Sequence, residues 1–118
     1  MGRKRKTMIT ENYVSFETAK LLKEKGFDAP CDWAYTKEGI IFKPIYWSEV
    51  FRCPTLQMAM KWLREKNIII NVWYNGVDWD AEYYNDEDEN FYLITDPSCN
   101  SYEEACEEAI RYCLKNLI

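Results

Sequence analysis

The stretch Asn67–Asp96, NIIINVWYNGVDWDAEYYNDEDENFYLITD, constrains the fold most, because it holds most of the strong β-formers of the chain. Ile68–Tyr74 is a run of β-branched and aromatic residues broken only by Asn71. Asn75-Gly76 then supplies two residues that adopt positive φ at little cost. The sequence therefore predicts a strand followed by a type I′ hairpin turn.

Two sets of side chains alternate from residue 77 to residue 84. This period of two is typical of a strand with one buried face and one face in water. The apolar set, which we expect to face the core, is Val77, Trp79, Ala81 and Tyr83. The other set, whose acids we expect to point into solvent, is Asp78, Asp80, Glu82 and Tyr84.

A third strand is predicted after a polar turn. Asn85–Asn90 (NDEDEN) is too polar to pack, and Phe91–Thr95 returns as a strand that Asp96-Pro97 ends. Three such strands form an antiparallel meander, and its apolar face has to be covered by helices.

Two helices are predicted before the meander. Ser15 is placed as the N-cap of a helix that stops at Gly26. A second helix is expected from Thr55 to Lys66, with Pro54 at its first turn. Each segment carries an apolar stripe at helical spacing, which indicates packing against a core.

The third helix has the clearest start. Ser101 as N-cap and Glu104 three residues later form a capping-box pattern. The residues that follow at helical spacing are mostly apolar, and two of them are cysteines in positions where packing requires small side chains. The stripe comprises Cys106, Ala109, Ile110, Cys113 and Leu117.

A hairpin is expected between the first two helices. Cys31–Tyr35 and Ile40–Tyr46 are its strands, and Pro44 places the second at an edge. This region is unusually aromatic. We expect most of its rings in the core and one or two near Pro44, such as Tyr46 and Trp47, in a contact surface.

These elements predict a single α+β domain at residues 13–118, of the order α-ββ-α-βββ-α, with an antiparallel sheet covered on one face by helices. Residues 1–12 are expected to be a flexible basic arm because they hold the cationic run Arg3–Lys6. The basic start is followed by polar residues, and no apolar run approaches a membrane span. A cytoplasmic protein without a membrane partner is expected.

Charge is distributed unevenly along the chain. Residues 1–66 hold 13 Lys and Arg against 8 Asp and Glu, whereas residues 67–118 hold 2 against 12. No Lys or Arg occurs from Asn67 to Ile110. The order α-β-β-β-α in this half is also that of double-stranded RNA binding domains, but such domains need a cationic face for phosphates. A nucleic-acid partner is therefore not expected.

No catalytic, cofactor-binding or metal-binding residues are predicted. The five cysteines include no C-x-x-C pair and the chain has no histidine, which argues against a disulfide framework and the common zinc sites. The acidic run Asp86–Glu89 fails as a calcium loop, because Phe91 stands where glycine is needed and Pro97 where the bidentate Glu belongs. A non-enzymatic protein is expected; a small enzyme without a recognisable motif is an alternative, and it predicts an enclosed pocket.

Three stretches carry a resemblance that covers under half of the chain. They are YVSFETAKLLKEKGFDAPC (Tyr13–Cys31), PTLQMAMKWLREKNI (Pro54–Ile68) and SYEEACEEAIRYCLKNLI (Ser101–Ile118). They resemble small uncharacterised proteins of phages, prophages and mobile elements of gut Bacteroidetes. The resemblance implies an accessory role in a bacterial cytoplasm and no particular reaction.

We expect the protein to act by protein–protein interaction, with a protein partner or with itself, through exposed aromatic residues beside charged rims. The candidate contact residues are Tyr46, Trp47, Trp73, Asp78, Asp80, Glu82, Asp86, Glu87, Asp88 and Glu89. An alternative is an acidic mimic of DNA that inhibits a host DNA-binding protein, which requires carboxylates on one continuous face. Its acids would be Asp78, Asp80, Glu82, the 86–89 run, Glu103, Glu104, Glu107 and Glu108.

Overall fold

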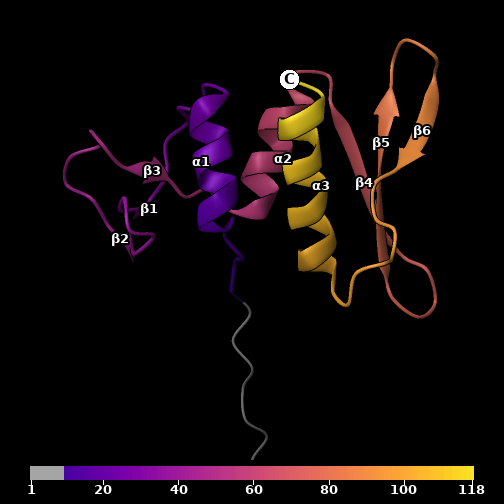
Figure 1. The fold of residues 1–118 in the computed structure, drawn as a ribbon, viewed down its shortest axis with the longest axis horizontal. Coiled ribbons are helices and arrows are strands. Elements are labelled where there is room, and N and C mark those ends of the chain that lie inside the picture. The colour runs from indigo at the N-terminus through magenta and orange to yellow at the C-terminus, as the bar shows by residue number, and fades with distance from the viewer. Residues whose placement is uncertain (1–9) are drawn as a thin grey trace, which may run out of the picture.

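The order of helices and strands confirms the predicted single α+β domain (Figure 1). The computed structural model describes residues 10–118, so the predicted basic arm at Arg3–Lys6 lies outside the described residues. The elements are α1 (Phe16–Glu24), β1 (Ala34–Tyr35), β2 (Ile41–Phe42), β3 (Phe51–Arg52), α2 (Leu56–Arg64), β4 (Ile69–Tyr74), β5 (Trp79–Asn85), β6 (Asn90–Leu93) and α3 (Tyr102–Asn116).

The predicted meander forms the larger of two sheets, with the strand order β4-β5-β6 and antiparallel pairing throughout. Helices α2 and α3 pack against one face of this sheet, as Figure 1 shows. On that face Ile70 and Ala81 are buried, and Tyr83 packs at the margin of the core. The strong β-formers therefore supply one wall of the core, as the alternation predicts. The expectation for Val77 is wrong, because Val77 lies in the loop before β5 and is 80% exposed.

The turn between β4 and β5 differs from the predicted type I′ turn. The strands close at the pair Tyr74 and Trp79, which leaves a loop of residues 75–78 in which only Gly76 has a positive φ, of 101°. The Asn75 side-chain carbonyl accepts the N–H groups of Val77 (2.9 Å) and Asp78 (2.8 Å). The type I′ prediction is wrong because the Asn75 side chain caps the backbone of the loop, so Asn75 does not need positive φ.

The smaller sheet has the order β2-β1-β3. The predicted hairpin is present in a shorter form, with Ala34 opposite Phe42 and Tyr35 opposite Ile41. β3 pairs with the other side of β1 and was not predicted from the sequence. Figure 1 shows this sheet and the β4-β5-β6 sheet on opposite sides of the helices.

Side-chain oxygens begin the first two helices. The Ser15 hydroxyl accepts the N–H of Thr18 at 3.2 Å, and the Thr55 hydroxyl accepts that of Met58 at 3.1 Å. The expected position of Pro54 in the first turn is wrong, because Thr55 is the N-cap and Pro54 precedes it. Preceding residues also take part in the fold, since the Asn12 carbonyl accepts the N–H of Leu56 at 2.9 Å.

The N-cap of α3 is confirmed, whereas its capping box is altered. The Ser101 hydroxyl accepts the N–H of Glu104 at 3.1 Å. The Glu104 carboxylate accepts the N–H of Asn100 at 2.9 Å, so it reaches one residue beyond the position that a capping box requires.

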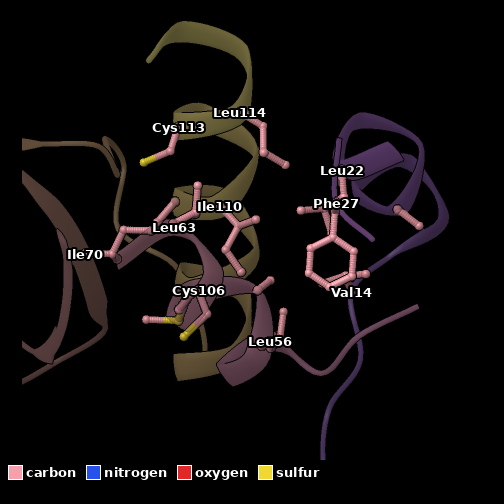
Figure 2. Close-up of a cluster of buried hydrophobic side chains, with 14 of the residues drawn as sticks. Val14, Leu22, Phe27, Leu56, Leu63, Ile70, Cys106, Ile110, Cys113 and Leu114 are labelled. Atoms are coloured by element: carbon pink, nitrogen blue, oxygen red, sulfur yellow. The ribbon is translucent and has the colours of Figure 1, made fainter. Parts of the chain in front are cut away.

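The core is one continuous cluster between the β4-β5-β6 sheet and α1, and α3 runs through its centre (Figure 2). The predicted apolar stripe of α3 is buried except for Leu117, which is partly exposed. Leu114, which is not part of that stripe, is fully buried as well. All five cysteines are free thiols, and three of them are buried in this cluster: Cys53, Cys106 and Cys113. No helix within residues 10–118 has the length and apolar character needed to cross a membrane.

Candidate interaction surface

The face of the β4-β5-β6 sheet that points away from α2 and α3 is uncovered in the described part of the chain; we call it the outer face. Strand alternation and register arrange its side chains in three rows across the sheet. The rows are Ile69, Tyr84 and Phe91; Asn71, Glu82 and Leu93; and Trp73 with Asp80.

The first two rows carry the most exposed apolar groups of the outer face. The side chains of Phe91 and Leu93 are 53% and 57% exposed. The ring of Tyr84 lies 5.0 Å from that of Phe91, centroid to centroid. Glu82 accepts a hydrogen bond of 3.2 Å from the Asn71 amide, so a single carboxylate lies among these apolar side chains.

Asp80 is buried, which corrects the expectation that it points into water. Its side chain is 9% exposed, because the chain from Thr95 to Ser98 passes over the end of β5. The carboxylate accepts hydrogen bonds from the Asn75 amide (2.8 Å), the Ser98 hydroxyl (2.7 Å) and the Thr95 hydroxyl (2.8 Å). In that order, these bonds lower the pKa of Asp80 from its ordinary value.

Trp73 and Asp78 lie near Asp80, at the same end of the sheet. Trp73 is part of the outer face, as the contact prediction requires, and its side chain is partly exposed. Asp78 belongs to the loop before β5 and is half-buried, with its backbone N–H bonded to Asn75. Of these three candidates, only Trp73 offers a large accessible apolar surface.

Within residues 10–118, β6 is an edge strand that has no strand paired to its outer side (Figure 1). The N–H of Ile94 donates to the carbonyl of Ala81 at 2.8 Å. Because bonded and non-bonded pairs alternate along antiparallel strands, Tyr92 also bonds to β5, whereas the backbone groups of Phe91 and Leu93 point away from it. The same two residues therefore present apolar side chains on the outer face and unpaired main-chain groups along the edge.

The acidic turn between β5 and β6, Asp86–Glu89, is exposed as predicted. Asp88 closes the turn: its carboxylate accepts the N–H of Asn90 at 3.2 Å and the hydroxyl of Tyr92. The bond to Asp88 is the main reason that the pKa of Tyr92 is raised. The turn thus fixes the Asp88 carboxylate and places the exposed acids Asp86, Glu87 and Glu89 beside the start of β6.

Three tyrosine rings connect the edge strand to α3. Tyr83 stacks on Tyr92 at 5.4 Å and on Tyr112 at 5.7 Å, centroid to centroid. These rings come from β5, β6 and α3 and lie on the face opposite the outer face. The stack fixes β6 against the helix layer from the covered side.

Tyr46 and Trp47 lie in the loop after β2, apart from the outer face. Tyr46 is 79% exposed, whereas Trp47 is half-buried with the guanidinium of Arg52 at 4.6 Å from its ring centroid. Since the two sheets lie on opposite sides of the helices, these residues do not share a surface with Trp73 (Figure 1). The structure therefore does not bring the predicted aromatic contact residues together.

A hollow of about 550 Å³ lies between the N-terminal segment, residues 96–100 and the first half of α3. Four glutamates line it: Glu103, Glu104, Glu107 and Glu108. Glu107 is held by the chain itself, because it accepts bonds from the Ser15 N–H (3.0 Å), the Ser15 hydroxyl (2.8 Å) and the Thr18 hydroxyl. The hollow was not predicted, since it joins segments that are distant in sequence.

The carboxylates required by the DNA-mimic alternative are divided among different surfaces. Glu82 lies on the outer face, and the glutamates of α3 lie on the covered side of the sheet. Asp80 and Glu107 are occupied by internal hydrogen bonds. The structure therefore gives no continuous acidic face from this set of residues.

The thiols offer little nucleophilic character. Burial raises the pKa of Cys106 to about 11 and that of Cys113 to about 12. Cys99 lines the hollow, and burial raises its pKa as well. Within residues 10–118, no group of three His, Cys, Asp or Glu side chains is arranged to hold a metal ion.

Sequence reasoning missed Phe91 and Leu93, because the strand pattern alone does not say which face of β6 they share with β5. The register shows the shared face, because Phe91 lies opposite Tyr84 and Leu93 opposite Glu82, and both β5 residues point to the outer face.

No protein-family model, curated protein or solved structure matches the chain.

Proposed function

We propose that the chain is a small, non-enzymatic accessory protein of a phage or mobile element, which acts in the bacterial cytoplasm by binding another protein through the outer face of the β4-β5-β6 sheet. The resemblance of its helical segments to proteins of this kind supports the accessory role. The binding role is supported by the structure of the outer face itself.

One observation carries the proposal: uncovered apolar side chains from three strands adjoin a free strand edge. They are Ile69, Trp73, Tyr84, Phe91 and Leu93. A contiguous apolar surface rimmed by polar groups is typical of an interaction site, and large rings supply much of the affinity at such sites. Monomeric proteins usually protect a free edge of this composition with lysine, proline or a covering segment.

Affinity capture from a bacterial lysate tests the proposal with two matched variants. Phe91→Thr combined with Leu93→Thr removes apolar area from the outer face and introduces β-branched residues, which favour a strand. Ile45→Thr combined with Tyr46→Thr removes exposed apolar area from the loop after β2. Circular dichroism confirms that both variants fold.

We expect the wild type and the loop variant to retain the same protein, and the outer-face variant to lose it. Equal retention by all three would contradict the proposal, because the outer face would then contribute nothing. If only the loop variant loses the partner, the interaction site lies in the loop after β2, beside the smaller sheet.

A further inference from the structure

The free edge of β6 determines how a partner can approach the outer face. Phe91 and Leu93 each offer an outward N–H and C=O, and they are separated by Tyr92, whose backbone is paired with β5. Two residues with this spacing form the repeat unit along which an extended segment adds to a sheet. Main-chain bonding at the edge would place alternate side chains of that segment beside Phe91 and Leu93 on the outer face.

The strands and the turn beside the start of β6 carry only negative charge. The nearest cations are Arg111 and Lys115 of α3, which line a hollow next to Ile94 after the other end of β6 and pair with glutamates there. Glu82 lies in the same row as Leu93, and the turn Asp86–Glu89 is adjacent to the start of β6. No Lys or Arg occurs between Asn67 and Ile110, so none of the three strands supplies a counter-charge. An added segment that carries basic residues at the end beside this turn would gain favourable electrostatic interactions.

We propose that β6 is the docking edge for an extended segment of another protein, in which two apolar residues separated by one residue are followed or preceded by Lys or Arg beside the acidic turn. The apolar pair extends the rows of Phe91 and Leu93, and the basic end lies against Glu87 and Glu89. This inference rests on the proposed function and specifies the chemistry of the partner.

A second copy of the chain is a poorer occupant. Pairing of two β6 edges would bring together two halves that each hold 12 Asp and Glu against 2 Lys and Arg in residues 67–118. The turn Asp86–Glu89 of one copy would approach the end of β6 and Asp96 of the other. Repulsion between these like charges opposes association of two copies, so the segment that complements the edge is cationic.

The first test uses three fluorescent peptides with the same alternating Val-Thr core. One carries a run of Lys at its C-terminal end, one carries it at its N-terminal end, and one carries Glu in place of Lys. Fluorescence anisotropy gives their affinities for the whole chain at low and high salt. The direction in which the peptide pairs with β6 decides which of the two Lys peptides has its basic end beside the acidic turn. We expect that peptide to bind at least about tenfold more tightly than the Glu peptide, and we expect high salt to reduce this difference.

Variants of the protein distinguish main-chain bonding at the β6 edge from side-chain contact on the outer face. Leu93→Thr keeps the outward N–H and removes the apolar side chain, whereas Leu93→Pro also removes the N–H without breaking a bond to β5. We expect Leu93→Pro to weaken the Lys peptide at least about tenfold more than Leu93→Thr does. Equal affinities of the two variants would overturn strand addition and leave the outer face as the binding surface.

Charge variants test the basic end. Glu87→Gln combined with Glu89→Gln should lower the affinity for the Lys peptide about tenfold, whereas Glu103→Gln on α3 should change it less than about twofold. Equal binding of the Lys and Glu peptides would overturn the charge assignment. Failure of all three peptides, with lysate capture still lost in the outer-face variant, would refute this inference and leave the proposed function standing. A dimer in sedimentation equilibrium that Leu93→Pro abolishes would assign the edge to a second copy.

Discussion

Replacement of Glu107 by alanine should destabilise the fold far more than the same change at Glu108, its neighbour on α3. Glu107 joins α3 to the start of α1, where it accepts hydrogen bonds from the backbone and hydroxyl of Ser15 and from the hydroxyl of Thr18. The side chain of Thr18 is fully buried, so removal of the carboxylate leaves its hydroxyl with Ser15 at 3.2 Å as its remaining partner. Glu108 instead forms an exposed ion pair with Arg111 at 3.2 Å.

The magnitude follows from these partners. A hydrogen bond to a charged group contributes roughly 1.5–3 kcal/mol, and the bonds of one group are not additive. An anion at a helix N-terminus adds about 0.3–1 kcal/mol. We therefore expect Glu107→Ala to lower the free energy of unfolding by about 2–4 kcal/mol. Glu108→Ala removes an exposed pair that contributes about 0–1 kcal/mol.

Urea denaturation provides the measurement, followed both by circular dichroism and by the fluorescence of the five tryptophans. A double-mutant cycle of Glu107→Ala with Ser15→Ala should give a coupling energy of about 1 kcal/mol or more, because the two residues bond directly. Equal unfolding free energies for Glu107→Ala and Glu108→Ala, within about 0.5 kcal/mol, would refute the assignment of Glu107 as the tie between the helices.

Two further predictions concern groups whose pKa the fold displaces. Because hydrogen bonds lower the pKa of Asp80 in the folded state, its contribution to stability is complete above the unfolded pKa of about 4 and is lost as the pH falls. Asp80→Asn should therefore lower the free energy of unfolding at pH 7 and reduce the loss of this free energy as the pH falls below about 4. Urea denaturation at several pH values measures this, and an unchanged loss of stability in acid would contradict the prediction. Since burial raises the pKa of Cys106 to about 11 and that of Cys113 to about 12, both thiols should resist alkylation at pH 8 in the native state and react in urea, as mass spectrometry can measure. Equal alkylation rates with and without urea would show that these thiols are accessible in the native state.

The elements that the sequence predicts well are those whose causes are local. Ser15 and Ser101 begin helices because each hydroxyl accepts an N–H three residues later, and such a bond needs no other segment. The alternation around Ala81 likewise identifies the covered face of β5. These patterns were sufficient for the α+β class and for the meander.

The errors and omissions arise where distant segments meet. β3 pairs only two residues with β1, which is too short for a period to be visible. Asp80 has the alternation of a solvent-facing residue, yet Thr95 and Ser98 close over it from beyond the next strand. Glu107 is indistinguishable by pattern from its neighbours on α3, because its partner Ser15 lies 92 residues earlier.

The candidate surface was predicted only in part. Trp73 and Glu82 do lie on the outer face, but the two residues that combine exposure with a free edge, Phe91 and Leu93, required the register of β5 and β6. Tyr46 was correctly expected to be exposed, although on the other side of the helices. The composition thus indicates that some apolar side chains are left for contact with a partner. Only the register of the strands shows on which surface these side chains lie together.

The buried carboxylate of Asp80 also has a consequence for local motion. It accepts bonds from Asn75 in the loop before β5 and from Thr95 and Ser98 in the segment after β6. If either segment opens alone, a carboxylate loses part of its hydrogen bonding in a site with little water, which costs more than the fraying of an ordinary loop. The two segments therefore form one cooperative opening unit at the end of the sheet that carries Trp73.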